Sequence, residues 1–396
     1  MNNKRVILVT GPPGNQRDEY LQRAIKGMDD VGYHHVFEYM QQVALNYFKT
    51  NLTRENVFDI PKNRLEDIRD ASIDEIAKRI NLSNKKIEII STPARFKVKP
   101  IRDYYSGFVD GLNESHIEKL KPDMIILFID DLLRVRRNLR QDEHWKRHIT
   151  PDLKTLAEWR QSAQEQIENY ITQVESSPKY SKYIDYIIFA REHPVETFQD
   201  LIKGEKPRVY LSYNITGREK DKAMGKIEKL REELSKHFVC IDPYAIKDWD
   251  IVTAYDEALE KGSDKVSVKI KYREETLKEE LYANEVGNCI DLIRSQIVSR
   301  DLRLIDFCHA IFVYHWAEAP SYGVMAEVIH ATTKASAYVY VVYPYKKRLS
   351  PFFEHYAGEK IFHGDDENQL IEKAISAMVN EYKTWPKYVK AQKNMR

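Results

Sequence analysis

Two carboxylates in the C-terminal half of the chain are the residues best suited to chemistry. Glu327 follows the apolar run 310–314 and lies about one turn into a helix expected from residue 323 to residue 334. Asp301 lies on the helix expected before that run, over residues 290–308. A nucleophilic carboxylate and a second carboxylate that acts as acid or base are what cleavage of a glycosidic bond requires.

Each carboxylate also has a purely structural explanation. Glu327 is an acidic residue near the start of a helix, where a negative charge favours the helix dipole. Asp301 has Arg300 and Arg303 as neighbours, so it could form a surface ion pair. The segment before Glu327 adds a feature that these explanations leave out. Ser321 offers a hydroxyl and Gly323 stands at the expected helix N-terminus, a combination that suits a bound anion such as phosphate.

Alternation of apolar runs with long helical patterns describes the elements that must position these residues. The first half has apolar runs at 6–10, 86–91, 124–129 and 183–189. Gly204 and Pro207 interrupt the pattern, which resumes with runs at 208–212, 238–241, 310–314 and 337–343. This alternation predicts an α/β protein with two open, mostly parallel sheets, divided into domains 1–204 and 205–396. Ligands of such sheets bind at the carboxyl ends of the strands. The polar stretch 244–285 fits no element clearly, apart from a helix expected near its end.

The loop after the first strand occupies the place of a phosphate-binding P-loop. Gly11-Pro12-Pro13-Gly14 precedes a helix, and Gln16-Arg17-Asp18 stands where Gly-Lys-Ser/Thr would be needed. Arg17 could supply a positive charge, whereas Asp18 brings a carboxylate and no magnesium-binding hydroxyl. Gly11, Gly14 and Arg17 are therefore candidates for nucleotide binding.

With two later segments, this half loosely resembles a degenerate kinase of the adenylate-kinase-like branch of P-loop kinases. These are the segment 91–96 and a strand followed by an arginine-rich helix carrying Arg134, Arg136, Arg137 and Arg140. The resemblance implies that Arg134 and Arg137 contact a nucleotide; the alternative is a solvated helix face. Without the P-loop lysine, retained nucleotide binding or a structural role is expected rather than phosphoryl transfer.

Residues 206–380 resemble the nucleoside 2-deoxyribosyltransferase superfamily, most closely its 2′-deoxynucleoside 5′-phosphate N-hydrolase branch. Four segments carry the resemblance in order: 210–219 (YLSYNITGRE), Asp301-Leu302, 320–327 (PSYGVMAE) and 347–350 (KRLS). Tyr213 replaces a glycine of the family's first loop, which is one residue shorter here.

The resemblance implies an N-glycosidase that hydrolyses the bond between base and sugar of a (deoxy)nucleoside 5′-monophosphate. The reaction would be a double displacement through a glycosyl-enzyme. Glu327 would be the nucleophile, Asp301 the acid or base, and Tyr210 the residue that orients Glu327 or the sugar. The 5′-phosphate would be bound by Ser321, Gly323, Gly217, Arg218 and a neighbouring subunit's Ser350. The expected partners are therefore a small-molecule nucleotide substrate and further copies of the chain in a homo-oligomer, and no cofactor or metal is needed.

Bulk composition narrows the remaining choices. The chain has 62 Lys and Arg against 61 Asp and Glu, so its net charge of +1 gives no reason to expect nucleic acid as a partner. No apolar run approaches the roughly 20 residues that span a bilayer. The three cysteines are scattered and odd in number, so we expect no disulfide framework and a protein located in the reducing cytoplasm. The alternatives to a nucleotide N-glycosidase are a nucleoside deoxyribosyltransferase, a nucleotide kinase, and a nucleotide sensor without turnover.

Overall fold

The computed structural model describes residues 4–101, 105–177, 183–214, 220–273, 275–319 and 321–394. The chain forms two compact units. The first comprises residues 1–192 and 246–296, and the second comprises residues 193–245 and 297–396. Each unit is built around a five-stranded sheet whose strand pairs are all parallel. The predicted fold class, two open parallel α/β sheets, is confirmed.

The first unit places its sheet strands in the order β2-β3-β1-β6-β7. Its N-terminal stretch contains β1 (Arg5–Thr10), α1 (Arg17–Ile25), β2 (Val31–His35), α2 (Val36–Phe48), a 3-10 turn η1 (Val57–Asp59), α3 (Lys62–Leu82), β3 (Ile87–Ser91), β4 (Arg95–Ile101), β5 (Tyr105–Asp110), α4 (Glu114–Leu120), β6 (Met124–Ile129), α5 (Leu132–Gln141), α6 (Glu143–His148), α7 (Leu153–Ser176) and β7 (Asp185–Ala190). Its second stretch contains α10 (Trp249–Glu260), β10 (Lys265–Lys271), β11 (Thr276–Tyr282) and α11 (Ala283–Gly287).

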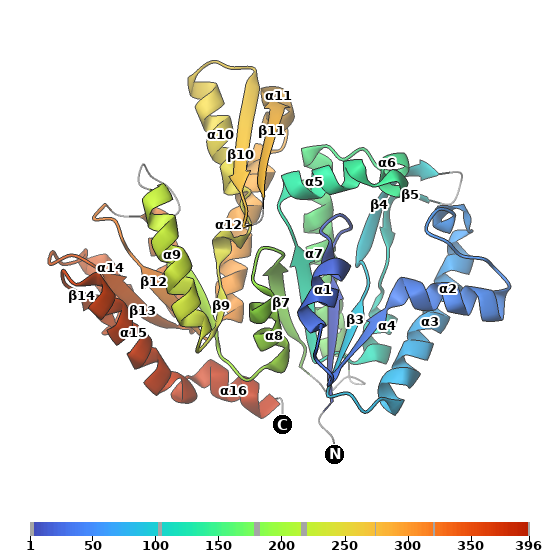
Figure 1. Ribbon diagram of the computed structural model, residues 1–396, viewed down its shortest axis with the longest axis horizontal. Coiled ribbons are helices and arrows are strands. Elements are labelled where there is room, and N and C mark those ends of the chain that lie inside the picture. The colour runs from blue at the N-terminus through green and yellow to red at the C-terminus, as the bar shows by residue number, and fades with distance from the viewer. Residues whose placement is uncertain are drawn as a thin grey trace. The chain divides into compact units, whose positions relative to one another are not determined.

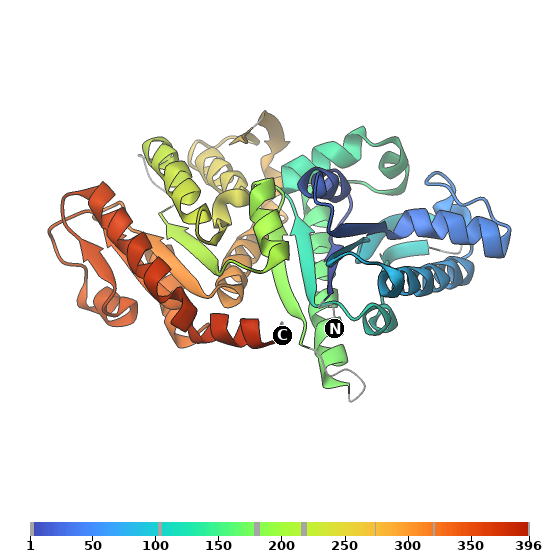
Figure 2. The same cartoon turned by 60° about the horizontal axis from the view of Figure 1, so that its bottom comes forward.

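Continuous apolar runs produce the central strands of this sheet. β6 reads MIILFI and is buried along its whole length, and five of the six residues of β1 are buried as well. A strand covered on both faces needs apolar side chains on both, so it reads as an unbroken run rather than an alternation. Helices α2 and α3 lie side by side away from the central strands, as Figures 1 and 2 both show in blue.

The second unit places its sheet strands in the order β14-β13-β12-β8-β9. Its elements are α8 (Val195–Lys203), β8 (Arg208–Tyr213), α9 (Lys220–Ser235), β9 (Val239–Ile241), a 3-10 turn η2 (Pro243–Ala245), β12 (Ala310–Tyr314), α13 (Tyr322–Thr333), β13 (Tyr338–Tyr343), α14 (Pro351–Ala357), β14 (Ile361–His363), α15 (Glu367–Glu381), a 3-10 turn η3 (Tyr382–Thr384) and α16 (Pro386–Asn394). Helix α12 (Ile290–Phe307) begins in the first unit and continues into the second.

One face of the second sheet carries a continuous apolar core. Side chains from β8, β12 and β13 pack there against helices α9 and α15, and Trp385 is fully buried among them. Figure 2 shows α15, in red, lying along this sheet. The core fixes the register of the three strands, because a slip of one residue would turn these side chains to the other face.

The two units do not coincide with the predicted domains 1–204 and 205–396, because two segments of the chain belong to the other unit. Residues 193–204, including α8, belong to the second unit, and residues 246–296 return to the first. Buried hydrogen bonds hold the returning segment there. The carboxylate of Asp248 accepts from the backbone N–H of Leu132 at 3.0 Å and from Arg160 at 2.6 Å. Such long-range pairs leave no local pattern in the sequence.

The prediction of a helix near the end of segment 244–285 is wrong over residues 276–282. These residues form β11, which pairs with β10 in an antiparallel hairpin that runs alongside α10 (Figure 1). Leu277 and Leu281 are buried while Thr276, Lys278 and Glu280 are exposed. A spacing of four suits one face of a helix and one face of a strand alike, and pairing with the alternating partner KVSVKIK decides for the strand.

Candidate functional site

The order in which successive strands are added to the second sheet reverses at β8, so the carboxyl end of β8 is a topological switch point. The chain passes from β8 to β9 on one side, then to β12, β13 and β14 on the other. Read in chain order the sheet is 2-1-3-4-5, a doubly wound arrangement whose ligands bind beside the first strand, at the switch point. The segments that leave β8 and β12 therefore mark the position where a ligand site is expected.

Glu327 extends from α13 to the strand at this switch point. Its carboxyl oxygens accept hydrogen bonds from the hydroxyl of Tyr210 at 2.7 Å and from the hydroxyl of Ser212 at 2.5 Å. Tyr210 and Ser212 are two residues apart on β8, so their side chains leave the same face of the strand. The expected contact between Tyr210 and Glu327 is present. Ser212 was not among the expected site residues, although its spacing from Tyr210 was a usable signal.

Asp301 lies on α12 and forms an ion pair with its neighbour Arg300. The two side chains approach to 2.9 Å and are only 13% and 8% exposed, respectively. The expected alternative of a surface pair is therefore half right, because the partner is Arg300 but the pair is buried. Removing two charges from water is costly, so losing either partner of this pair would leave an uncompensated buried charge.

Burial and mutual repulsion determine the charge on the two carboxylates. Burial, and then the charge of Asp301, raise the pKa of Glu327 to about 8, while the hydrogen bonds from Ser212 and Tyr210 oppose the rise. Burial also raises the pKa of Asp301 against the effect of Arg300. Burial and the Glu327 charge raise the pKa of Tyr210, which keeps its hydroxyl a donor. Two acids that resist ionising together can divide the roles of nucleophile and proton donor.

The raised pKa of Glu327 predicts a pH-dependent effect on stability. In the folded protein this carboxyl keeps its proton up to about pH 8, whereas an unfolded glutamate titrates near about 4.3. Between these values unfolding releases a proton, so wild-type stability falls as pH rises. Glu327→Gln cannot ionise, and its melting temperature should rise relative to wild type from about pH 5 to about pH 8. Thermal melts across this range measure the difference; a constant or shrinking difference would contradict the raised pKa.

Asp242, at the end of β9, is a second site residue that the sequence did not reveal. Its carboxylate accepts from the Tyr213 hydroxyl at 2.8 Å and from Arg231 at 2.9 Å. The hydroxyl of Tyr213 is therefore engaged by Asp242. The charge of Asp242 also contributes to the raised pKa of Asp301. An acidic residue directly after a predicted strand was the available signal.

The expected phosphate-binding residues have mixed outcomes. Ser321 caps α13, and its hydroxyl oxygen accepts from the backbone N–H of Val324 at 3.4 Å. Gly323 lies exposed in the first turn of that helix. Ser350 is exposed and caps α14, accepting from the backbone N–H of Phe353 at 3.2 Å. This cap leaves the hydroxyl hydrogen of Ser350 available to another acceptor, and its contact with a neighbouring subunit's phosphate stays a prediction. Gly217 and Arg218 lie outside the described residues.

Two of the three loop residues expected to bind a nucleotide line a cavity in the first unit. The cavity has a volume of about 600 Å³, and Gly14 and Arg17 are among its lining residues. Gly11 instead packs against the neighbouring strand, because a Cβ there would lie 2.1 Å from the carbonyl oxygen of Phe128. The cavity and the Glu327 site belong to different units.

The structure does not bring Arg134 and Arg137 to this cavity. Arg134 is 3% exposed, pairs with Glu192 at 2.9 Å and lies over the ring of Tyr272 at 3.4 Å. Arg137 forms two hydrogen bonds of 2.7 Å with Glu275. The arginines of α5 thus attach the returning segment 246–296 to its unit, and their side chains range from 3% exposed at Arg134 to 49% exposed at Arg140.

The part of the chain that the structure describes holds neither a metal-ligand cluster nor a membrane-spanning helix. No three His, Cys, Asp or Glu side chains there are grouped so that they could hold a metal ion. Among the same residues, no helix has both the length and the apolar character needed to cross a bilayer.

Comparisons with known proteins add little. No protein-family model and no curated protein matches the sequence. Among solved structures, the chain is similar to an uncharacterized protein from Eubacterium ventriosum, at 15% identity and a TM-score of 0.27. The match covers 50% of this chain and 96% of that chain.

Proposed function

We propose that the second unit is an N-glycosidase that hydrolyses the bond between base and sugar in (deoxy)nucleoside 5′-monophosphates. The observation that carries the proposal is the arrangement of Glu327. Its carboxyl group accepts hydrogen bonds from Tyr210 and Ser212 at the switch point of the sheet, and the charge of Asp301 acts on it. Paired acids that differ in environment are the feature that glycosidases use.

The reaction follows from the roles of the two acids. A carboxylate oxygen of Glu327 attacks C1′ of the sugar, and the bond from C1′ to the base nitrogen breaks with its electron pair going to the base. The reacting form of the pair carries its one proton on Asp301, and Asp301 gives that proton to the departing base. Water then attacks C1′ of the glycosyl-enzyme and gives a proton to Asp301. The bond between C1′ and Glu327 breaks, and Glu327 leaves as a carboxylate. Tyr210 and Ser212 hold Glu327 in position throughout.

A phosphorylated substrate is favoured over a free nucleoside. Ser321 stands at the N-terminus of α13, where backbone N–H groups attract an anion. A hydroxyl that accepts one hydrogen bond keeps its own hydrogen for a second partner, so the cap does not prevent Ser321 from binding a phosphate oxygen. The 12-residue helix α13 also carries Glu327, one and a half turns further along.

A substrate comparison tests the proposal. Purified protein would be incubated with each 2′-deoxynucleoside and ribonucleoside, with and without a 5′-phosphate, and the free base would be measured by chromatography. We expect base release, with kcat/KM at least about 10-fold higher for monophosphates, which corresponds to one charge-assisted contact. No base release from any of them would contradict the proposal. Adding a second free base separates hydrolysis from transfer, because a deoxyribosyltransferase would form a new nucleoside.

A further inference from the structure

The cavity of about 600 Å³ in the first unit has no role in the proposed reaction. It lies at the carboxyl ends of β1, β2 and β3, and its lining includes the loop after β1 and residues of α5 and α6. A ligand of an open parallel sheet binds at this end, and the volume falls within the range of small-molecule sites. The composition of the walls therefore decides which class of molecule the cavity admits.

The loop after β1 lacks three of the backbone N–H donors that it could otherwise offer to a phosphate. Pro12 and Pro13 have no backbone N–H, and the N–H of Arg17 donates to the side-chain oxygen of Asn15 at 3.1 Å. The two glycines are explained by packing rather than by the approach of a ligand. A Cβ on Gly14 would lie 2.8 Å from Leu139, and Gly11 is similarly restricted.

A fixed negative charge stands beside this loop. Asp18 accepts hydrogen bonds from Tyr33 at 3.0 Å and from Ser91, and it pairs with Arg17 at 3.1 Å. Burial would raise the pKa of Asp18, but Arg17 and the hydrogen bonds from His35 and Ser91 lower it well below its ordinary value. Asp18 therefore stays ionised at every physiological pH. Its side chain is 33% exposed and lines the cavity, where a phosphate would have to displace Asp18 from Arg17.

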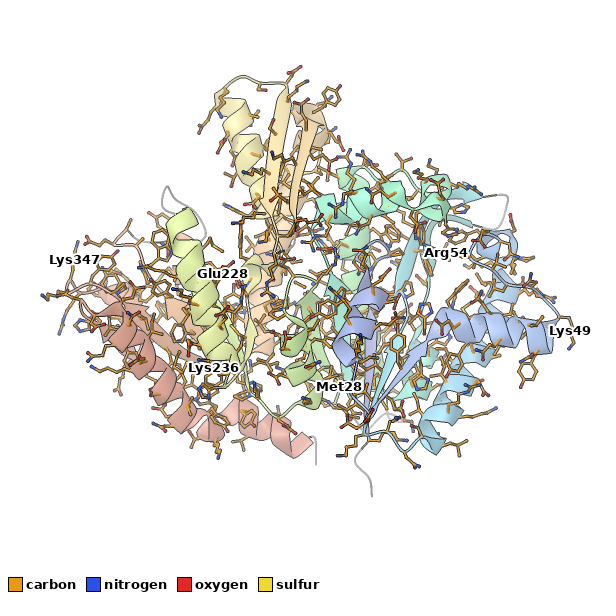
Figure 3. All side chains as sticks on the ribbon, viewed as in Figure 1. Met28, Lys49, Arg54, Glu228, Lys236 and Lys347 are labelled. Carbon is orange, nitrogen blue, oxygen red and sulfur yellow. The ribbon has the colours of Figure 1, made fainter. Side chains whose placement is uncertain are left out.

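The other cations of the lining are also engaged by acceptors. Arg17 donates to Ser91 at 2.8 Å in addition to its pair with Asp18. Arg54, which Figure 3 labels, comes from the segment between α2 and η1 and pairs with Asp142 at 2.5 Å. Arg69 donates to the carbonyl oxygen of Asp110 at 3.0 Å. The lining contains three arginines and the three carboxylates of Asp18, Glu19 and Asp142, so the formal charges of these groups balance.

One wall of the cavity is aromatic. Phe58 stacks on His144 with ring centres 5.6 Å apart, and Phe96 stacks on Trp145 at 6.2 Å. Burial, with the charges of His148 and Arg54, lowers the pKa of His144 to about 4, so its ring is neutral at pH 7. The four rings all line the cavity, and planar faces of this kind attract another planar ring.

We propose that this cavity binds a planar, uncharged heteroaromatic molecule, namely a nucleobase or nucleoside, and that it rejects the corresponding nucleoside phosphates. The aromatic wall contacts the ring of the ligand, and the neutral side chains of Gln16, Thr92 and Asn138 supply hydrogen-bonding groups. Asp18 excludes phosphate from the loop. The proposal uses no residue of the Glu327 site, so either can fail without the other.

Binding to the full-length protein tests this proposal. Titration calorimetry would be run with adenine, guanine, cytosine and uracil, with their nucleosides, and with ATP, GTP, CTP and UTP. We expect at least one base or nucleoside to bind, and its triphosphate to bind at least about 10-fold more weakly because of the charge on Asp18. A triphosphate that binds more tightly than its nucleoside would overturn the proposal, as would no binding by any base or nucleoside at about 1 mM.

Two variants examine the walls separately. Trp145→Leu removes a stacking face and should lower the affinity for the base or nucleoside by about 10-fold, whereas Trp145→Phe should retain most of that affinity. Trp249→Leu, outside the cavity, is the matched control. Asp18→Asn should bring the affinities for triphosphate and nucleoside at least about 5-fold closer together. Unchanged affinity in Trp145→Leu, or an unchanged ratio in Asp18→Asn, would overturn the proposal. The wild-type comparison remains decisive if a variant does not fold.

Discussion

Replacing Glu327 with glutamine is expected to lower the rate of base release from nucleoside monophosphates by at least about 10³-fold. Glutamine fills the same space and can still contact Tyr210 and Ser212, whose hydroxyls lie 2.7 and 2.5 Å from the present carboxyl oxygens. It cannot form the bond to C1′, because an amide is a far weaker nucleophile than a carboxylate. The variant therefore forms no glycosyl-enzyme. Mass spectrometry of a quenched reaction checks this directly, because the adduct would add the mass of the sugar phosphate to the protein.

Two controls separate lost chemistry from lost structure. The thermal transition of Glu327→Gln should remain cooperative and should not fall below that of wild type at pH 8, because the buried carboxyl with its raised pKa is gone. Glu372→Gln makes the same chemical change at an exposed position of α15 and should leave the rate unchanged. Base release at the wild-type rate in Glu327→Gln would show that another residue is the nucleophile.

The elements that carry the site could be predicted because their sequence pattern is local. The run AIFVY is buried along its whole length as β12, and the following α13 places Glu327 as its spacing from residue 323 predicted. Ser212 and Asp242 were missed for the opposite reason. Each gains its role from a partner, Glu327 in one case and Tyr213 in the other, that the fold brings to it from a distant part of the chain.

The arginines of α5 show the same limit from the other direction. A run of Arg134, Arg136, Arg137 and Arg140 has the composition of an anion-binding helix, and the adjacent sequence supplies partners for Arg134 in Asp130 and Asp131, at 3.5 and 3.8 Å. The other partners are Glu192 and the glutamates of segment 275–285, which lie as many as about 150 residues away along the chain. Charge patterns identify groups that need a partner, and tertiary structure decides whether the partner is a ligand or the protein itself.

Changing Asp301 to asparagine should have the second largest effect on the reaction. If Asp301 transfers the proton to and from the leaving base, its loss should lower kcat by about 10² to 10⁴-fold, the range that general acid and base groups contribute. Bases that leave easily need less protonation, so the loss should be smaller for a nucleotide with an activated base. Asp291→Asn, on the same helix but with a side chain that is 96% exposed, provides the matched control.

The pH profile of Asp301→Asn distinguishes a participant in the reaction from a structural residue. The charge of Asp301 helps to raise the pKa of Glu327 to about 8, so below that pH the two acids of the wild type hold one proton between them, and kcat/KM should fall above about pH 8 as the proton needed by the departing base is lost. Asp301→Asn removes both that proton site and that charge, so the falling limb near pH 8 should disappear, and the remaining rate should rise with the ionisation of Glu327 at lower pH. A residue that only supported the fold would lower the rate and leave the limb in place. A limb that stays near pH 8 in Asp301→Asn would therefore refute the electrostatic coupling between the two carboxylates, even if the rate falls.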